Sequence, residues 1–534
     1  MNNKKLSVYL PVIFAVILLI GIVLGMQFGQ MGHSLSLVKI KNNSKLNDVI
    51  NWVNKNYVDP ESKDDLREKA ITGMLQSLDP HSVYIPASEF HEATDPLLGS
   101  FEGIGVQFRI ESDSITVIIP VSGGPSEKVG IKAGDRIVTI DGKKVAGIKI
   151  TNSDVLHRLK GKKGTTVKVG IYRRGARGLT DYTIIRDIIP TYSLDVAYMA
   201  TPGIGYIRLS NFSAKTHEEI HDALKKLNSL GMKKLILDLR GNGGGYLQAA
   251  IDVADEFLPA GKLIVYTEGK HHPREYAYST ANGLFETGDL TLLLDEWSAS
   301  ASEIVAGAIQ DNDRGEIIGR RSFGKGLVQE QLDFKDGSAI RLTVARYYTP
   351  TGRCIQKPYK NGTEDYYNQY YHRLLDTETG KPDSIHFPDS LKFKTPEGKI
   401  VYGGGGIQPD IYIPVEKDSL LKYYVTLVNK GTIYQYAFEY TDKYRKDLSL
   451  NKTFEQFDKN FRINDAIYED FLKYADKKGI KREGKDLAAS DARTKVMLKA
   501  YIGRNILDNP GFYPYLNSID LTFHRAVDYL EKGK

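Results

Sequence analysis

The sequence has 534 residues, a formal net charge of +6 at pH 7 and 41% hydrophobic residues, which indicates a folded protein too long for one hydrophobic core. Because 72 Lys and Arg residues are dispersed among 66 Asp and Glu residues, no basic patch points to nucleic acid as a partner. The single cysteine, Cys354, excludes an internal disulfide framework, and no neighbouring residue is suited to activate it as a nucleophile.

The N-terminal residues carry an export signal. Lys4 and Lys5 precede a stretch from Leu6 to Phe28 that is almost continuously apolar, uncharged and long enough to span a bilayer. The stretch lacks a small-x-small cleavage site and a cysteine for lipid attachment, which favours a retained signal anchor over residues 1–30. We therefore expect a protein anchored in a bacterial-type inner membrane with its body in the periplasm or outside the cell. Secretion after signal cleavage is the alternative.

A small helical segment is predicted over residues 31–96, because apolar residues recur at helical spacing from Lys45 onward. The helical pattern ends at Asp79-Pro80-His81, since proline disfavours helical backbone in the residue before it. His81 invites a Ser/His interpretation, but beside a helix-ending proline it is more typical of a turn.

Residues 97–187 combine the glycine turn Gly103-Ile104-Gly105-Val106 with strand-like runs and a Gly-Ile-Lys-Ala-Gly-Asp-Arg-Ile sequence. This pattern resembles a PDZ domain, which is an α+β fold. Successive amides of such a turn can bind a terminal carboxylate, while the edge of the next strand pairs with an extended peptide. The turn residues are therefore candidates for binding protein substrates with free, apolar C termini, although the glycines could serve the turn alone.

The chain from 188 to 415 alternates strand and helix patterns, which predicts an α/β core. A buried strand ending at Asp238 leads into a Leu-Arg-Gly-Asn-Gly-Gly-Gly turn and then a helix, an arrangement suited to binding an anion. A phosphate-binding loop is the rival interpretation, but the Lys and Ser/Thr of a Walker motif are missing. Arg240 is expected to form a structural ion pair at this turn.

The stretch 297–331 carries the strongest candidate site. Ser300 opens a Ser-Ala-Ser-Glu sequence at the start of an apolar-periodic helix, and Lys325 stands between two glycines before a short strand. Positions four apart share one face of a strand, so Lys325 and Gln329 are expected to point the same way. The structural alternatives are that Ser300 and Glu303 only form a capping box and that Lys325 is only a solvated loop lysine.

Ser-Ala-Ser-Glu followed by Phe-Gly-Lys-Gly and a later glutamine closely resembles the core of the C-terminal processing peptidases, also called tail-specific proteases. These are serine peptidases that use a Ser/Lys pair. The resemblance implies that Ser300, rather than Ser298 or Ser302, is the nucleophile. It also implies that Lys325 is the general base and that Gln329 orients it.

The same resemblance implies an α/β peptidase core of the crotonase/ClpP-like type, with an oxyanion hole formed by the amide of Ala301 and that of Gly244 or Gly245. A neutral amine can accept a serine proton, but the ordinary lysine pKa of about 10.4 must fall by about 3 units for this at pH 7. Burial among apolar neighbours lowers a lysine pKa, and a glutamine carbonyl can fix the amine without restoring a full opposite charge.

Residues 350–403 are predicted to form an insertion rich in tyrosine, including Tyr366-Tyr367 and Tyr370-Tyr371. The tyrosines could bind substrate, pack on the surface or contact a partner.

The predicted architecture is completed by a charged C-terminal helical domain over 416–534, which contains none of the catalytic motifs and could support homo-oligomerisation or bind an activating partner. We found no zinc-ligand spacing, Walker loop or EF-hand loop, so neither a metal nor another cofactor is expected. The sequence therefore predicts an α/β multidomain serine endopeptidase that recognises C-terminal tails through its PDZ domain. A noncatalytic PDZ scaffold on a peptidase-like core is the alternative, and a His-dependent serine hydrolase lacks the Gly-x-Ser-x-Gly elbow.

Overall fold

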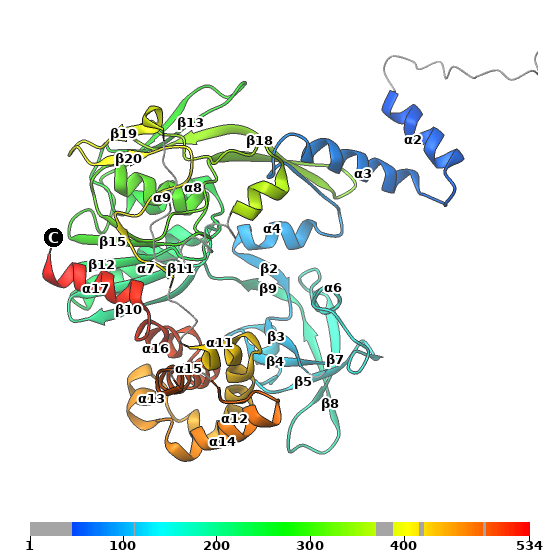
Figure 1. Ribbon diagram of the computed structural model, residues 1–534. Coiled ribbons are helices and arrows are strands. Elements are labelled where there is room, and N and C mark those ends of the chain that lie inside the picture. Colours follow the sequence, from blue (N-terminus) through cyan, green and yellow to red (C-terminus); the bar gives the residue numbers. More distant parts are fainter. Residues whose placement is uncertain (1–44, 112, 370–387, 416–420, 484–486, 534) are drawn as a thin grey trace, which may run out of the picture. The chain divides into compact units, whose positions relative to one another are not determined.

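The computed structural model describes residues 45–111, 113–369, 388–415, 421–483 and 487–533 (Figure 1). The chain divides into two compact units, Met1–Met74 and Leu75–Lys534. The signal anchor predicted over residues 1–30 lies outside the described residues. Within the described ranges, no helix combines the length and apolar character needed to cross a bilayer.

The described part of the first unit is helical, as predicted. Helix α2, Lys45–Asn56, has Asp48 in its first turn and Lys55 in its last, an order that suits the helix dipole. Helix α3, Lys63–Gln76, begins after Ser62, whose hydroxyl accepts a hydrogen bond from the Asp65 amide at 3.0 Å.

The turn after α3 is organised by Asp79. Its carboxylate accepts hydrogen bonds from the amides of His81 at 2.8 Å and Ser82 at 2.9 Å, and from the Ser82 hydroxyl at 2.6 Å. Strand β1, Val83–Ile85, follows and pairs antiparallel with a strand of the core. Helix α4, Phe90–Leu98, then leads to the PDZ-like region.

The PDZ-like region forms an antiparallel sheet in the order β3-β4-β5-β7-β8, with the strands at the expected positions. Its elements are β3 (Val106–Glu111), β4 (Ser114–Pro120), α5 (Pro125–Lys128), β5 (Arg136–Ile140), β6 (Lys143–Lys144), α6 (Asn152–Leu159), β7 (Thr166–Tyr172) and β8 (Leu179–Ile185). Ile115, Val117 and Val169 are fully buried in its core. Because β3 ends the strand order, one of its edges is unpaired among the described strands. Strand β2, Ser100–Gly103, comes before this region in the chain and β9, Asp187–Pro190, comes after it, and the two strands pair antiparallel.

The core contains a six-stranded sheet in the order β10-β11-β12-β15-β16-β21, in which every pairing after β10–β11 is parallel. The strands are β10 (Leu194–Thr201), β11 (Ile204–Leu209), β12 (Lys234–Asp238), β15 (Asp289–Leu294), β16 (Glu316–Gly319) and β21 (Ile411–Tyr412). One face packs against α7 (Thr216–Ser229), α8 (Leu247–Asp255) and α9 (Ala301–Asp311). Strand β12 is apolar on both faces because the sheet is covered on both sides.

A second sheet lies beside the first and has the order β1-β18-β13-β14, with β17 also paired to β18. Its remaining strands are β13 (Leu263–Glu268), β14 (Glu275–Tyr278), β17 (Leu327–Asp333) and β18 (Ala339–Tyr348). Strand β17 confirms the short strand predicted after Lys325.

The beginning of the predicted insertion 350–403 packs into the core. Arg353 is fully buried and forms an ion pair with Asp311 at 2.6 Å. Tyr366 is also fully buried, which excludes a surface role for this tyrosine, whereas Tyr370 and Tyr371 lie outside the described residues. The later part holds a 3-10 turn, Asp389–Leu391, and a hairpin of β19 (Lys392–Lys394) and β20 (Ile400–Tyr402).

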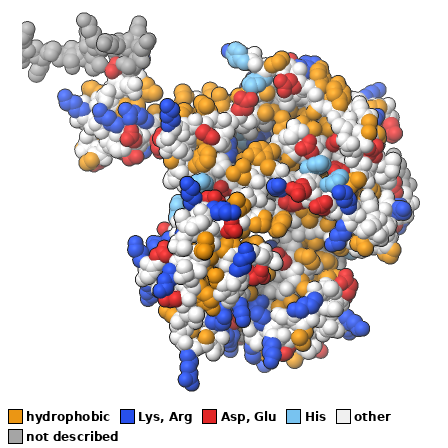
Figure 2. Space-filling model, turned by 180° about the vertical axis from the view of Figure 1, so that it is seen from behind, with side chains coloured by type: hydrophobic (Ala, Val, Ile, Leu, Met, Phe, Trp, Pro, Cys, Tyr) orange, Lys and Arg blue, Asp and Glu red, His pale blue; other side chains and the backbone are white. Residues whose placement is uncertain are grey.

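The tail is helical, as predicted, but its last helix packs against the core. Its elements are α11 (Lys422–Asn429), α12 (Thr432–Leu448), α13 (Phe454–Asn460), α14 (Asp465–Lys477), α15 (Leu487–Leu507), a 3-10 turn (Asn509–Gly511), α16 (Tyr513–Asn517) and α17 (Leu521–Lys532). Phe523, Ala526 and Leu530 of α17 cover the second face of the six-stranded sheet. On the face shown in Figure 2, basic and acidic side chains are interspersed.

Candidate active site

The strand β12 ends in a charge cluster that fixes the following glycine turn. Asp238 is fully buried and forms ion pairs with Arg208 at 2.9 Å and Arg240 at 2.7 Å. Burial alone would raise the pKa of the Asp238 carboxyl, but the two guanidinium groups hold it below its ordinary value. Arg240 also pairs with Asp520 at 2.7 Å, just before α17. The structural ion-pair role predicted for Arg240 is therefore confirmed.

The glycine turn lies directly against Ser300. Gly244 has φ of 99°, and a Cβ placed on it would lie 2.7 Å from the Ser300 Cβ, so only glycine fits here. The Gly244 amide donates to Asn242 Oδ1 at 2.9 Å. Gly245 forms a parallel bridge with Phe212. Its hydrogen bonds run from the Phe212 amide to the Gly244 carbonyl and from the Tyr246 amide to the Phe212 carbonyl, so the Gly245 amide takes no part in them. No acceptor for the Gly245 amide is found within the described residues.

Ser300 is the N-cap residue of α9 and has unusual backbone angles. Its φ of 54° and ψ of −113° are strained for a residue with a side chain, a condition common at functional sites. The hydroxyls of the two neighbouring serines are buried and structural, since Ser298 donates to the Leu239 carbonyl at 2.9 Å and Ser302 to the Asn242 carbonyl at 2.9 Å. Ser300 is the serine of this motif that lines the cavity.

Glu303 joins the start of α9 to the lysine loop. One carboxylate oxygen accepts from the Ser300 amide at 2.8 Å and from the Lys325 amide at 2.9 Å. The other oxygen accepts from the Ser322 hydroxyl at 2.5 Å and from the Gly324 amide at 2.7 Å. Burial raises the pKa of this carboxyl, and these four donors oppose the rise by stabilising the ionised form.

Lys325 stands in an environment that lowers its pKa. Burial lowers the pKa of the Lys325 amine below its ordinary value, while the nearby Glu303 carboxylate opposes the decrease. The Tyr347 hydroxyl lies 2.6 Å from the Lys325 carbonyl and 3.2 Å from the Ser300 carbonyl, which gives the two segments a second link. In the described part of the chain, no hydrogen bond joins the Lys325 amine to the Ser300 hydroxyl or to Gln329.

Gln329 is connected through Thr343 of β18 to the turn that precedes β1. Its amide nitrogen donates to the Thr343 hydroxyl at 3.3 Å, and that hydroxyl donates to Asp79 at 3.1 Å. His81 of the same turn lies 2.9 Å from the Tyr366 hydroxyl. Burial, together with the nearby Lys325 charge, lowers the pKa of His81 to about 3, so this ring is neutral at pH 7.

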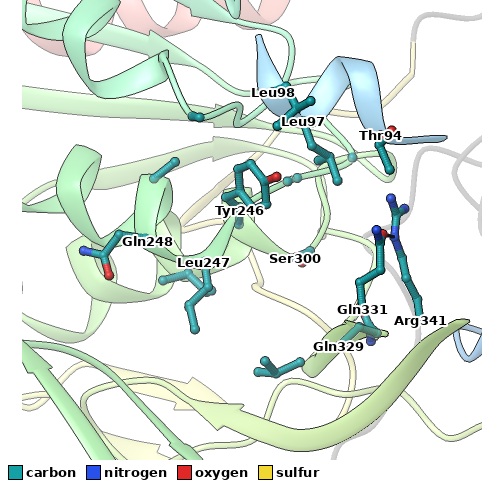
Figure 3. Close-up of a pocket in the computed structure, with 18 of the residues that line it drawn as sticks. Thr94, Leu97, Leu98, Tyr246, Leu247, Gln248, Ser300, Gln329, Gln331 and Arg341 are labelled. Carbon is teal, nitrogen blue, oxygen red and sulfur yellow. Dashed lines mark hydrogen bonds between the residues drawn. The ribbon is translucent and has the colours of Figure 1, made fainter. Parts of the chain in front are cut away.

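Ser300, Lys325 and Gln329 share the wall of one cavity of about 1030 Å³. In Figure 3, Ser300 lies between α4, which carries Leu97 and Leu98, and the strands that carry Gln329 and Arg341. The lining of the cavity is largely apolar. Its apolar residues include Phe90, Leu97, Leu98, Leu247, Ala249, Ile304, Leu327 and Val328. The cavity can therefore hold an extended apolar segment beside the serine.

The oxyanion and PDZ candidates lie at two separate places. Ala301 begins α9, and its amide lies close to Gly244, because a Cβ on that glycine would be 2.9 Å from the Ala301 nitrogen. In the PDZ-like region, the turn Gly103-Ile104-Gly105-Val106 leads directly into β3. The Ile104 side chain is buried, and its carbonyl accepts from the Ser126 amide at 3.1 Å.

Sequence reasoning missed two features. Glu303 was considered only as a capping partner, because its contacts with the lysine loop are tertiary. The absence of zinc-ligand spacing was also wrong at one place, since His217 and His221 stand four apart in a His-Glu-Glu-Ile-His sequence and meet Glu256. That pattern was the signal that could have identified them.

Comparisons with known proteins agree with this organisation. Family models match for peptidase family S41 at residues 203–366, a PDZ domain at 103–182, the activating protease CtpB N-terminal domain at 27–88 and a family of unknown function (DUF8443) at 423–508. The carboxy-terminal-processing protease of Bartonella bacilliformis is 39% identical over 318 residues, which cover 59% of this chain and 72% of that protein. The carboxy-terminal processing protease CtpA of Bacillus subtilis is 37% identical over 314 residues, covering 59% and 66%. Among solved structures, the photosystem II D1 C-terminal processing protease is 27% identical, covers 70% of this chain and 92% of that one, and gives a TM-score of 0.35.

Proposed function

Because the chain belongs to the carboxy-terminal-processing proteases of peptidase family S41, we propose that it cleaves peptide bonds with Ser300 as nucleophile and Lys325 as general base. The observation that carries the proposal is the shared cavity, in which a strained N-cap serine and a half-buried lysine of lowered pKa line the same wall. A neutral lysine can accept a serine proton in the role that histidine has in other serine peptidases.

The proposed reaction is acyl transfer. Lys325 takes the proton of the Ser300 hydroxyl while the serine oxygen attacks the substrate carbonyl carbon. The carbonyl oxygen gains negative charge and accepts hydrogen bonds from the amides of Ala301 and Gly245. Lys325 then gives the proton to the leaving amine as the peptide bond breaks, and water hydrolyses the acyl-enzyme.

Two hydrogen-bond arrangements support the assignment of the remaining residues. The Gly244 amide is engaged by Asn242, which favours Gly245 as the second oxyanion donor. Gln329 donates through its nitrogen to Thr343, an orientation that directs its carbonyl oxygen elsewhere and suits it to accept from the Lys325 amine.

We further propose that the PDZ domain binds free, apolar C termini at the turn Gly103-Ile104-Gly105-Val106 and at the unpaired edge of β3. The apolar lining of the cavity favours the same class of substrate. A C-terminal peptide is expected to bind the full chain more tightly than its amidated form. Equal affinity for the two peptides would contradict carboxylate binding.

Export of the catalytic body is also part of the proposal, supported by the apolar, uncharged sequence from 6 to 28. Mass spectrometry of the mature N terminus distinguishes a retained anchor from a cleaved signal, since a start near residue 30 would exclude the anchor.

The central test is cleavage of an unstructured protein with an apolar C terminus by the full chain. Ser300→Ala and Lys325→Ala are each expected to abolish cleavage while folding and peptide binding are kept. Ser302→Ala is the matched control, because it removes a neighbouring hydroxyl that is hydrogen-bonded to the backbone.

Full cleavage by Lys325→Ala would contradict the Ser/Lys mechanism. The scaffold alternative predicts a different result: no cleavage by the parent, no labelling of Ser300 by a serine-reactive probe, and unchanged peptide binding.

A further inference from the structure

Two histidines of α7 and the glutamate that follows α8 form a compact cluster at the edge of the active-site cavity. His217 Nε2 lies 2.9 Å from Glu256 Oε1, and His221 Nδ1 lies 2.7 Å from the same oxygen. Both rings lie on one face of α7 because residues four apart on a helix are neighbours. Among the described residues, these three bring their nitrogen and oxygen atoms within 4.8 Å of one another and could hold a metal ion.

Glu256 has no permanent cationic partner in the described part of the chain. Its side chain is 2% exposed, and the groups of opposite charge that reach it are the two imidazoles, which are charged only when protonated. Its second oxygen accepts from the Leu284 amide at 2.9 Å. A buried carboxylate without a cation is unfavourable, so the cluster is suited to a positive charge between Glu256 and the two rings.

The donor set suits a zinc-class ion. Zinc binds imidazole nitrogen and carboxylate oxygen at about 2.0–2.2 Å, so a tetrahedral site needs donor separations of about 3.4 Å. The present separations of 2.9 and 2.7 Å are shorter than this value, so the rings must move slightly away from the carboxylate to admit an ion. The His217 and His221 side chains are 46% and 31% exposed, which leaves them room to adjust and gives an ion access from solvent. The hydrogen bond from Leu284 fixes the carboxylate, as outer contacts do in metal sites.

We propose that His217, His221 and Glu256 form a binding site for a divalent transition metal of the zinc class, with water completing the coordination. The ion joins the first turn of α7 to the end of α8. Because α8 begins directly after the glycine turn and His217 lines the cavity, the ion stiffens the wall that carries Gly245. Imidazole ligands favour this class of ion over Mg²⁺ and Ca²⁺, which prefer sites made of oxygen.

The site binds metal without adding a second hydrolytic centre. In a His-Glu-x-x-His metalloprotease, the glutamate after the first histidine is the general base. Here that residue is Glu218, whose side chain is 70% exposed and pairs with Lys215 at 3.3 Å. The following residue, Glu219, accepts from the amides of Ser193 and Leu194 at 2.8 Å each. Neither carboxylate is among the groups that converge on the proposed ion.

The test measures metal binding by the full chain after treatment with a chelator. Zn²⁺ titration by calorimetry is expected to give one equivalent bound, and Co²⁺ is expected to give the visible absorption of a low-symmetry nitrogen and oxygen site. Added Zn²⁺ should raise the unfolding temperature, whereas Mg²⁺ should not. His217→Gln/His221→Gln should weaken Zn²⁺ binding by more than about tenfold and remove the shift in unfolding temperature.

His271→Gln/His272→Gln is the matched control, since it removes two histidines of which one lies 3.8 Å from a glutamate without a third ligand group. This variant should bind Zn²⁺ as the parent does. A parent that binds no Zn²⁺, or a His217→Gln/His221→Gln variant with unchanged affinity, overturns the proposal. Equal unfolding temperatures of the metal-free parent and variants show that the substitutions leave the fold intact. Because the readouts are binding and stability, the result is independent of whether Ser300 is the nucleophile.

Discussion

The clearest structural prediction concerns Glu303→Gln. Each carboxylate oxygen of Glu303 accepts two hydrogen bonds: one oxygen from the amides of Ser300 and Lys325, and the other from Ser322 and Gly324. Glutamine has the same shape but replaces one of these oxygens with an NH₂ group. If the NH₂ group faces Ser300 and Lys325, two buried amides face another donor. If it faces Ser322 and Gly324, the Gly324 amide does, because the Ser322 hydroxyl can also accept.

The expected loss of stability follows from that count. A buried donor left without an acceptor costs about 1–3 kcal/mol, so one or two of them lower the free energy of unfolding by about 1–6 kcal/mol. The loss also separates the start of α9 from the lysine loop. A displacement of about 1 Å between reacting groups can lower turnover by about 100-fold, so we expect kcat to fall by at least that factor.

Urea unfolding of the parent and Glu303→Gln, followed by fluorescence, measures the first quantity, and peptide cleavage measures the second. Glu218→Gln is the control, because that side chain is 70% exposed and its loss should leave both quantities nearly unchanged. A Glu303→Gln protein within about 0.5 kcal/mol of the parent and with the parent's kcat would refute the reasoning, since such a change is typical of surface substitutions.

Three further predictions use other contacts. In Lys325→Met, the free energy of unfolding at pH 7 should equal or exceed that of the parent. The parent's stability should rise with pH between the lowered folded-state pKa of Lys325 and 10.5, because the unfolded chain keeps a proton that the folded chain releases. A Lys325→Met protein with the same rise would contradict the effect of burial on this lysine. The parent should also lose stability as the pH falls from 6.5 toward about 3, by about 1.4 kcal/mol per pH unit, because unfolding lets His81 take up a proton. Urea midpoints measured at pH 7 and pH 4 should therefore differ less in His81→Gln than in the parent. Arg109 of β3 lies 4.6 Å from the ring centre of Tyr434 and 4.0 Å from that of Phe438. Arg109→Ala should therefore weaken the contact between the PDZ domain and the tail by about 0.5–2 kcal/mol and speed hydrogen exchange in β3. Unchanged exchange would argue against the contact.

Local sequence signals were sufficient where one segment determines its own structure. The strands of the PDZ domain, the glycine turn after β12 and the helix that begins after Ser300 all follow from periodicity and glycine placement. The choice of Ser300 among three nearby serines came from the family resemblance and stays a prediction. In the structure, Ser298 and Ser302 are buried and hydrogen-bonded to backbone while Ser300 lines the cavity.

The rest depends on contacts between distant segments, which periodicity does not encode. Asp79 reaches Thr343 across 264 residues, and Arg240 reaches Asp520 across 280. The same limit explains why the last tail helix, α17, was assigned to a separate helical domain although it covers the core sheet. It also explains why Glu256 was not associated with His217 and His221, since it stands 35 residues after His221.

These distant contacts indicate which part of the site is preset and which part still has to move. Glu303 and Tyr347 fix the backbones of Ser300 and Lys325 relative to each other, yet no hydrogen bond joins their side chains in the described chain. In the mechanism we propose, the Ser300 hydroxyl and the Lys325 amine meet by rotation of their side chains, because the two backbones are already held together. The space for that rotation is the cavity, one wall of which is α4, and α4 leads directly into the PDZ domain.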